Sequence, residues 1–224
     1  MSLSLADAVA KVNEIFATYG SSTGGTDLVG EEWKAGKVYE AWILSVVLER
    51  LEQIEGFEVA LVGGSKVHLK SSPGPINTNY PHFVLSRTGS ESLAVWTDVE
   101  FSTLSFHLKG LSGSPGKAHR HELDVVVVPV GTIGYPNPTE IMLGVECKNT
   151  GFQKHMARAI LGVRRELSML RNEEHPTPFV TWPRSGVPAV PPSVVMVFST
   201  DPAVDEYNAA GVVFGVDFCH EPMP

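Results

Sequence analysis

Cysteine is scarce in this 224-residue chain, and long apolar segments are absent. Its two cysteines, Cys147 and Cys219, lie far apart in the sequence, and neither belongs to a C-x-x-C or paired Cys/His motif. Nothing therefore supports a disulfide framework or a structural zinc site. No run of about 18 apolar residues could span a bilayer, and the N-terminal MSLSLADAVAKVNE carries charged residues where a signal peptide needs an apolar stretch. We expect a cytoplasmic protein with no membrane partner.

Basic residues are also in deficit. The chain has 17 Lys and Arg against 25 Asp and Glu, a formal net charge of −8. Because phosphate binding depends on Lys and Arg, this balance argues against a nucleic-acid partner unless positive charge is concentrated locally. Residues 1–60 hold 4 basic and 10 acidic residues and 172–224 hold 1 and 7, whereas 151–171 hold 5 and 1. The acidity thus lies in the flanks of the chain.

The pattern of apolar residues predicts helices and strands in a mixed order. We expect helices over 4–18, 36–56, 151–170 and 202–211, and strands over 57–64, 66–72, 82–88, 92–106, 121–130, 140–149, 193–200 and 212–218. With 43% hydrophobic residues the chain can bury a core without crosslinks. The order of elements predicts an α/β fold in which helices flank a central mixed β-sheet.

We expect one domain over residues 1–224. Residues 1–25 are expected to form an N-terminal helix and a Gly-rich linker. Residues 60–118 are expected to form an extra strand-rich segment and a mobile loop, inserted before the strand 121–130.

One carboxylate is predicted to lie in the apolar stripe of the second helix. At 100° per residue, Glu40 falls on the same side as Leu44 and Leu51, whereas Ser45 and Glu49 take the solvent side. A buried unpaired carboxylate costs on the order of several kcal/mol, so it must be paired, protonated or bound to a cation. The alternative is that Glu40, near the helix start, is solvated or complements the helix dipole.

Two predicted strands carry further charged residues near their ends. Asp124 stands directly before four valines, and two-residue alternation places it on one side with Glu122 and Val126. In the next strand Glu146 and Lys148 share a face. The alternatives are a strand-terminating Asp and an exposed ion pair worth about 0.2–1 kcal/mol.

These carboxylates could converge on a single point. Carboxylate oxygens suit a hard divalent cation such as Mg²⁺, with Mn²⁺ as a substitute, and such an ion can hold a phosphate. The ammonium group of Lys148 could orient the attacking water and offset negative charge in the transition state. The residue types therefore favour phosphodiester hydrolysis.

At this point the sequence resembles the PD-(D/E)XK phosphodiesterase superfamily, which has the restriction-endonuclease-like fold. The resemblance rests on Asp124 in HELD, 22 positions before Glu146 in the triplet Glu146-Cys147-Lys148, and on Glu40 in the upstream helix. It implies that Asp124, Glu146 and Lys148 are catalytic and that Glu40, Asp124 and Glu146 bind the metal. One departure is that Leu123 stands where the motif name has Pro.

The basic segment after the proposed active-site strand offers a surface for nucleic acid. Lys154, Arg158 and Arg165 lie at spacings of 4 and 7 on one helix face, with Arg164 beside them. Such a row can hold a phosphate backbone without reading its sequence, although charge runs are usually solvated helix faces.

We therefore expect an Mg²⁺-dependent endonuclease that hydrolyses phosphodiester bonds of DNA. The resemblance further implies a restriction, defence or repair setting and a homodimer or larger complex. Two alternatives stay open: a catalytically inactive module of this fold that binds nucleic acid or a protein, and a nuclease acting on RNA.

Three other patterns point to weaker sites. Asp98 and Glu100 share a predicted strand face, but no lysine follows at the right spacing, and we expect both to face solvent. His119 and His121 form an H-x-H pair without a clear third ligand. The segment 111–118 departs from the phosphate-binding loop pattern at its first and last positions, which makes a nucleotide triphosphatase a poor interpretation.

Overall fold

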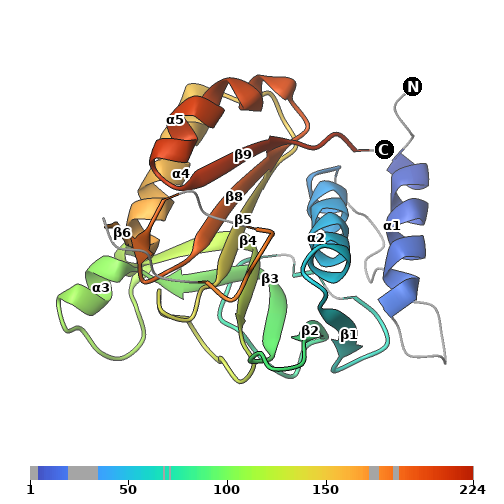
Figure 1. Cartoon of the computed structure of the whole chain (residues 1–224), viewed down its shortest axis with the longest axis horizontal. Coiled ribbons are helices and arrows are strands. Elements are labelled where there is room, and N and C mark those ends of the chain that lie inside the picture. The colour runs from blue at the N-terminus through green and yellow to red at the C-terminus, as the bar shows by residue number, and fades with distance from the viewer. Residues whose placement is uncertain are drawn as a thin grey trace.

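The computed structural model describes residues 5–19, 35–67, 69–70, 72–171, 177–183 and 187–223 (Figure 1). Its helices are α1 (Leu5–Tyr19), α2 (Ala35–Gln53), α3 (Leu104–Leu108), α4 (Lys154–Leu167) and α5 (Asn208–Val213), with short 3-10 helices over Lys117–His119 and Pro202–Tyr207. Its strands are β1 (Glu58–Val62), β2 (His82–Ser86), β3 (Leu93–Ser102), β4 (Arg120–Pro129), β5 (Leu143–Lys148), β6 (Met169–Leu170), β7 (Ala189–Val190), β8 (Val194–Ser199) and β9 (Val216–His220).

A mixed sheet forms the centre of the fold. Within the described residues it has seven strands in the order β1-β2-β3-β4-β5-β8-β9. Strands β1 to β5 pair with one another in antiparallel fashion, whereas β8 runs parallel to β5 and β9 parallel to β8. Parallel neighbours need a crossover, and α4 provides it between β5 and β8. The carboxyl end of β5 and the last turn of α4 therefore lie at opposite ends of the parallel strands.

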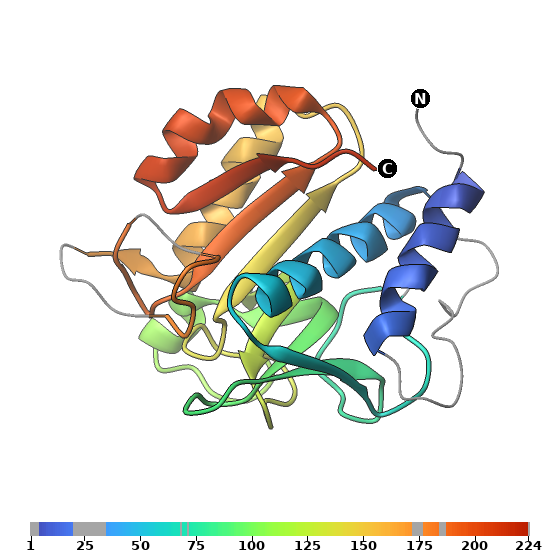
Figure 2. The same cartoon turned by 45° about the vertical axis from the view of Figure 1, so that its right-hand side comes forward.

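Two cores hold the helices against the two faces of this sheet (Figures 1 and 2). The α2-side core includes Leu44, Leu48, Val125 and Val127. The α4-side core includes Val126, Val197, Ile160 and Leu167. Burying each such aliphatic side chain contributes about 1.5–3 kcal/mol. The expected α/β class, with a mixed sheet flanked by helices, is confirmed.

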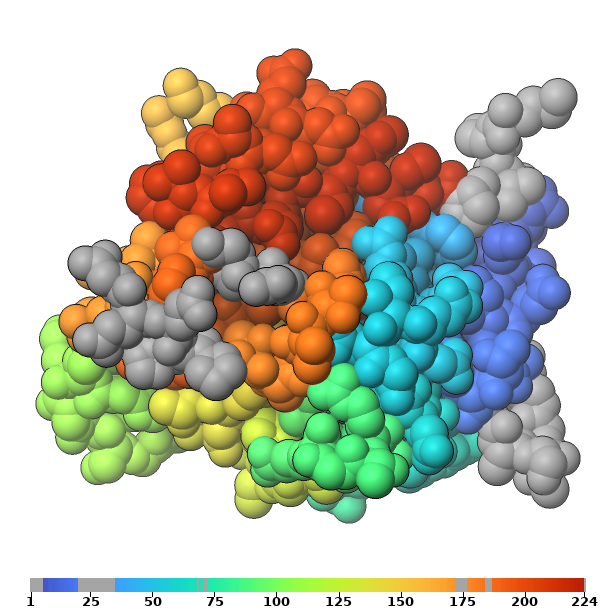
Figure 3. Space-filling model, in the orientation of Figure 1, coloured from blue at the N-terminus to red at the C-terminus, as the bar shows by residue number. Residues whose placement is uncertain are grey.

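Helix α2 is enclosed more completely than its sequence pattern indicates. Helix α1 packs against it, and Figures 2 and 3 show the two helices side by side. Ser45, which we expected on the solvent side, is fully buried, and its hydroxyl donates to the Trp42 carbonyl at 2.7 Å. That expectation was wrong because α1 and the sheet together leave α2 little solvent-facing surface.

Some predicted strand boundaries are also wrong. The segment 66–72 forms no strand in its described residues, although nearby Gly74 makes an isolated bridge to Val99. The end of the expected strand 92–106 is helix α3, where the Thr103 side chain caps the first turn. The start of the expected strand 212–218 belongs to α5, and Gly215 in the left-handed region separates that helix from β9. The linker part of residues 1–25 lies outside the described residues.

Glu55, just after α2, ties this helix to the loop over 177–183. Its carboxylate accepts the backbone N–H groups of Val180, Thr181 and Trp182, and Arg87 Nη1 lies 3.1 Å from its Oε2. The Glu55 side chain is wholly shielded from solvent. Its hydrogen bonds thus compensate for the burial of its charge.

Replacing Glu55 by Ala should lower the free energy of unfolding by about 3 kcal/mol, because it leaves the Arg87 charge and three N–H groups without their partner. Urea denaturation would measure the change. The exposed Glu58→Ala variant is the control, with an expected change within about 0.5 kcal/mol. Equal stabilities for the two variants would contradict this role.

Candidate metal centre

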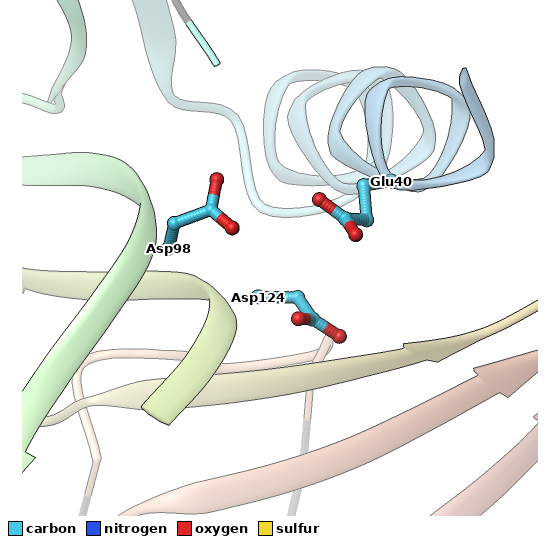
Figure 4. Close-up of side chains that lie close together, drawn as sticks. All are labelled: Glu40, Asp98 and Asp124. Carbon is cyan, nitrogen blue, oxygen red and sulfur yellow. The ribbon is translucent and has the colours of Figure 1, made fainter. Parts of the chain in front are cut away.

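Three carboxylates from different elements converge beside the first half of α2 (Figure 4). Glu40 comes from α2, Asp98 from β3 and Asp124 from β4, and each offers an oxygen atom within 4.8 Å of those of the other two. Asp98 and Asp124 are buried, and Glu40 is half-buried. Oxygen atoms this close suit a hard cation, so the triad could bind a metal ion.

Strands β3 and β4 both depart from regular alternation at this point. In β3, Val95 packs into the α2-side core, yet Val99, four residues later, packs into the α4-side core. In β4, Val125 and Leu123 are divided between the same two cores although they lie two residues apart. A regular strand places such residues on one face, so each strand changes face in between.

Asp98 and Asp124 occupy the irregular positions. The strand pairs on either side place them opposite each other. Asp98 has a φ angle of 50°, in the left-handed region that Asp tolerates better than most residues. In Figure 4 the Asp98 carboxylate points toward Glu40 of α2, whereas the Asp124 carboxylate points away from that helix, where its Oδ2 accepts the Cys147 N–H of β5. The prediction that Asp124 shares a face with Val126 was wrong, because Val126 lies in the α4-side core.

The β4–β5 pairing ends next to Asp124. The last paired residues are Val125 and Val145. Beyond them, the Asp124 carboxylate accepts the N–H of Cys147 at 2.6 Å, which joins the two strands where the backbone ladder stops. Glu146, 7% exposed, accepts a hydrogen bond from Lys148 Nζ at 2.6 Å. The Glu146–Lys148 pair thus lies beside Asp124, at the carboxyl end of β5.

Burial shapes the ionisation of these groups. It raises the pKa of Glu40 to about 7, with the Asp124 and Asp98 charges adding to the rise. It raises the pKa of Glu146 to about 7 as well, and there the Asp124 charge adds to the effect. The pKa values of Asp98 and Asp124 are also raised, chiefly by burial.

The site carries more negative than positive groups. The carboxylates that act on one another are Glu40, Asp98, Glu122, Asp124 and Glu146, and the lysines that act on them are Lys37, Lys70 and Lys148. Glu100 also acts on Lys70, but its charge is offset by its ion pair with Arg120. Five carboxylates against three ammonium groups leave an excess of two negative charges when all are ionised. One divalent cation would neutralise that excess.

Lys37 acts as an internal counter-ion to the triad. Its Nζ donates to Glu40 Oε2 at 2.5 Å and also to Asp98 Oδ1. The second oxygen of Asp98, Oδ2, is buried and has no hydrogen-bond partner. Buried polar atoms normally have a hydrogen-bond partner. Because Lys37 contacts Oδ1 and not Oδ2, the free Oδ2 could bind a cation held by the triad.

The structure separates the predicted ligands into two groups. Glu40 and Asp124 belong to the triad, whereas Glu146 lies outside it and pairs with Lys148. The third member of the triad is Asp98, and the prediction that Asp98 faces solvent was wrong because it is only 3% exposed. Its position in the middle of a strand whose other residues are mostly apolar was the available signal. Glu100 instead forms a partly exposed ion pair with Arg120, at 3.2 Å.

The predicted basic row lies on α4. Lys154, Arg158 and Arg165 are all exposed, whereas Arg164 is buried and contributes nothing to that surface. Helix α4 covers the sheet face opposite α2. Lys154 lies at the end of α4 that follows β5, and Arg165 lies about 16 Å farther along the helix axis. The row therefore leads away from the carboxylates.

Comparison with family models, curated proteins and solved structures gave no match to this chain. None of the helices in the described residues is long and apolar enough to cross a membrane. The function is therefore inferred from the site itself.

Replacing Lys37 by Met should strengthen Mn²⁺ binding about tenfold, equivalent to about 1.4 kcal/mol, because the ammonium no longer competes for Glu40 and Asp98. Calorimetric titration would measure the Kd. Lys11→Met, at an exposed position of α1, provides the matched control. An unchanged or weaker affinity in Lys37→Met would refute the counter-ion role.

The raised pKa values predict a pH dependence for the metal-free protein. Glu40 and Glu146 have pKa values near 7 when folded and near 4.5 when unfolded, so between these values the folded state binds more protons. Stability should therefore fall as pH rises from 5 to 8. Thermal unfolding in EDTA would show this fall, which should become shallower in Glu40→Gln. A slope unaffected by that substitution would count against the assignment.

Proposed function

We propose that the protein is a metal-dependent nuclease that hydrolyses phosphodiester bonds of DNA, with a restriction-endonuclease-like core of the PD-(D/E)XK type. The observation that carries this proposal is the convergence of the Glu40, Asp98 and Asp124 carboxylates beside the Glu146–Lys148 pair. The mixed sheet, with a helical acid on one face and the acids of β4 and β5 on adjacent strands, supports it.

The donor set favours Mg²⁺, with Mn²⁺ as a substitute. All three groups of the triad are carboxylates, which are the ligands of hard oxygen-binding cations, and no cysteine or histidine contributes to it. The excess of two negative charges favours a divalent ion. When bound, Mg²⁺ would supply Lewis-acid activation of a phosphoryl oxygen and a more acidic water.

Lys148 is suited to an electrostatic role. Burial alone would lower its pKa, but the Glu146 and Asp124 carboxylates raise that pKa above its ordinary value. The side chain therefore stays protonated near neutral pH and can offset charge that develops on the phosphate. Glu146 holds the ammonium group in place through the 2.6 Å hydrogen bond.

A nucleic acid is the favoured substrate because exposed cations lie close to the proposed catalytic strand, and the choice of DNA follows from the resemblance to the PD-(D/E)XK superfamily. Lys154 and Arg158 can hold the phosphate backbone near the carboxyl end of β5, and Arg165 would contact it farther along. In so acidic a chain, binding should depend strongly on salt. A homodimer or a larger restriction, defence or repair complex would add positive surface.

Plasmid DNA should be nicked or linearised by the purified protein with Mg²⁺ or Mn²⁺ and left intact in EDTA. Asp124→Asn and Lys148→Met should slow cleavage about 100-fold or more, because each removes a charge used in the transition state. Asp98→Asn should raise the metal concentration for half-maximal activity about tenfold or more. Gel assays on duplex DNA, single-stranded DNA and RNA would measure these rates.

Matched controls are Glu206→Gln and Lys11→Met, which change exposed charges elsewhere. Failure of the wild-type protein to cut any of the three polymers would overturn the proposal, as would undiminished cleavage by both Asp124→Asn and Lys148→Met. Cleavage of RNA alone would identify a ribonuclease. Binding without cleavage would identify an inactive module.

A further inference from the structure

A pocket of about 240 Å³ lies at the end of α4. It is lined by Leu161, Arg164, Arg165, Ser168, Leu170 and Phe214. Helix α4 returns the chain from the carboxyl end of β5 to the start of β8. The pocket therefore lies at the opposite end of these strands from Glu146 and Lys148. It is therefore independent of the candidate metal centre.

Arg164 brings a buried positive charge to this pocket. It is 2% exposed, and no carboxylate of the described residues lies within ion-pairing distance, although Asp217 acts on it from farther away. Its Nη1 donates to Ser193 Oγ at 2.8 Å and its Nε to the Phe214 carbonyl at 3.3 Å, whereas Nη2 has no partner. A buried cation without a counter-ion is unfavourable, so an anion would be stabilising here.

Ser168 adds a second unsatisfied polar group. It follows Arg164 by four residues and is 1% exposed, and its hydroxyl oxygen has no hydrogen-bond partner. Ser168 directly follows α4 and its N–H donates to the Arg164 carbonyl at 3.2 Å, so the two residues lie close together, and both line the pocket. The oxygens of a carboxylate or phosphate accept hydrogen bonds from a guanidinium and from a hydroxyl alike. One acid group could therefore satisfy both residues.

The other residues that line the pocket indicate what the rest of the ligand would be. Leu161, Leu170 and Phe214 are apolar, and Arg165 adds an exposed positive charge. At the ~30 Å³ that one water takes in the liquid, the volume holds about eight non-hydrogen atoms. This size suits a compact acid with an aromatic or short aliphatic body.

We propose that this pocket binds a small organic anion, whose acid group contacts Arg164 and Ser168 and whose apolar body fills the rest of the space. The bound anion links α4 to β6 and to the end of α5. It neutralises a charge that the described part of the chain leaves without a close counter-ion.

Thermal unfolding and calorimetric titration of the full chain test this with four probes: benzoate, phenyl phosphate, inorganic phosphate and the neutral benzamide. Benzoate or phenyl phosphate should raise the unfolding midpoint by about 5 °C at 100 times its Kd. The tighter of these two identifies the acid group. Inorganic phosphate should bind at least tenfold more weakly, and benzamide should cause no shift.

Two variants locate the binding without removing Arg164. Leu161→Trp fills the pocket from a half-buried position and should abolish binding, and Arg165→Glu should weaken it about tenfold or more. Arg158→Glu makes the same charge change two turns earlier on α4 and should bind as wild type does. The proposal fails if neither organic anion shifts the midpoint, if benzamide shifts it equally, or if Leu161→Trp and Arg165→Glu bind like the wild-type protein.

Discussion

Repulsion among carboxylates is the constraint around which one end of this fold is organised. Five acidic side chains interact where β4 and β5 separate, and burial keeps most of them from the water that would otherwise screen their charges. Lys37 bridges Glu40 and Asp98, and Lys148 donates a hydrogen bond to Glu146. The backbone N–H of Cys147 donates to one oxygen of Asp124. The two apolar cores supply the stability that keeps such a cluster in place.

The sequence made the architecture predictable wherever apolar runs were long. The four valines after Asp124 marked a buried strand, and the periodicity around Glu40 marked a helix with one apolar face. Asp98 was missed because strict alternation cannot anticipate a residue in the left-handed region that changes the face of its strand. Ser45 was misjudged for a non-local reason, since only the packing of α1 closes the outer side of α2. Local patterns thus identified the elements, whereas tertiary contacts decided which side chains meet.

Helix α4 connects two regions of different chemistry. It begins directly after the strand that carries Glu146 and Lys148, and it ends at the buried Arg164 and the pocket beside it. Its exposed cations lie on the face of the sheet away from α2, so a polymer that contacts both this helix and Glu40 must pass over the carboxyl end of β5.

The hydrogen bond between the Cys147 N–H and Asp124 connects a backbone amide directly to the carboxylate cluster. An amide at the frayed end of a ladder normally exchanges its hydrogen quickly with solvent. Here the N–H of Cys147 is held by an Asp124 oxygen at 2.6 Å, two residues beyond the last described β4–β5 pair. Hydrogen exchange at this single amide therefore reports on the charge and position of Asp124, and an amide resonance there becomes a natural spectroscopic probe of the site.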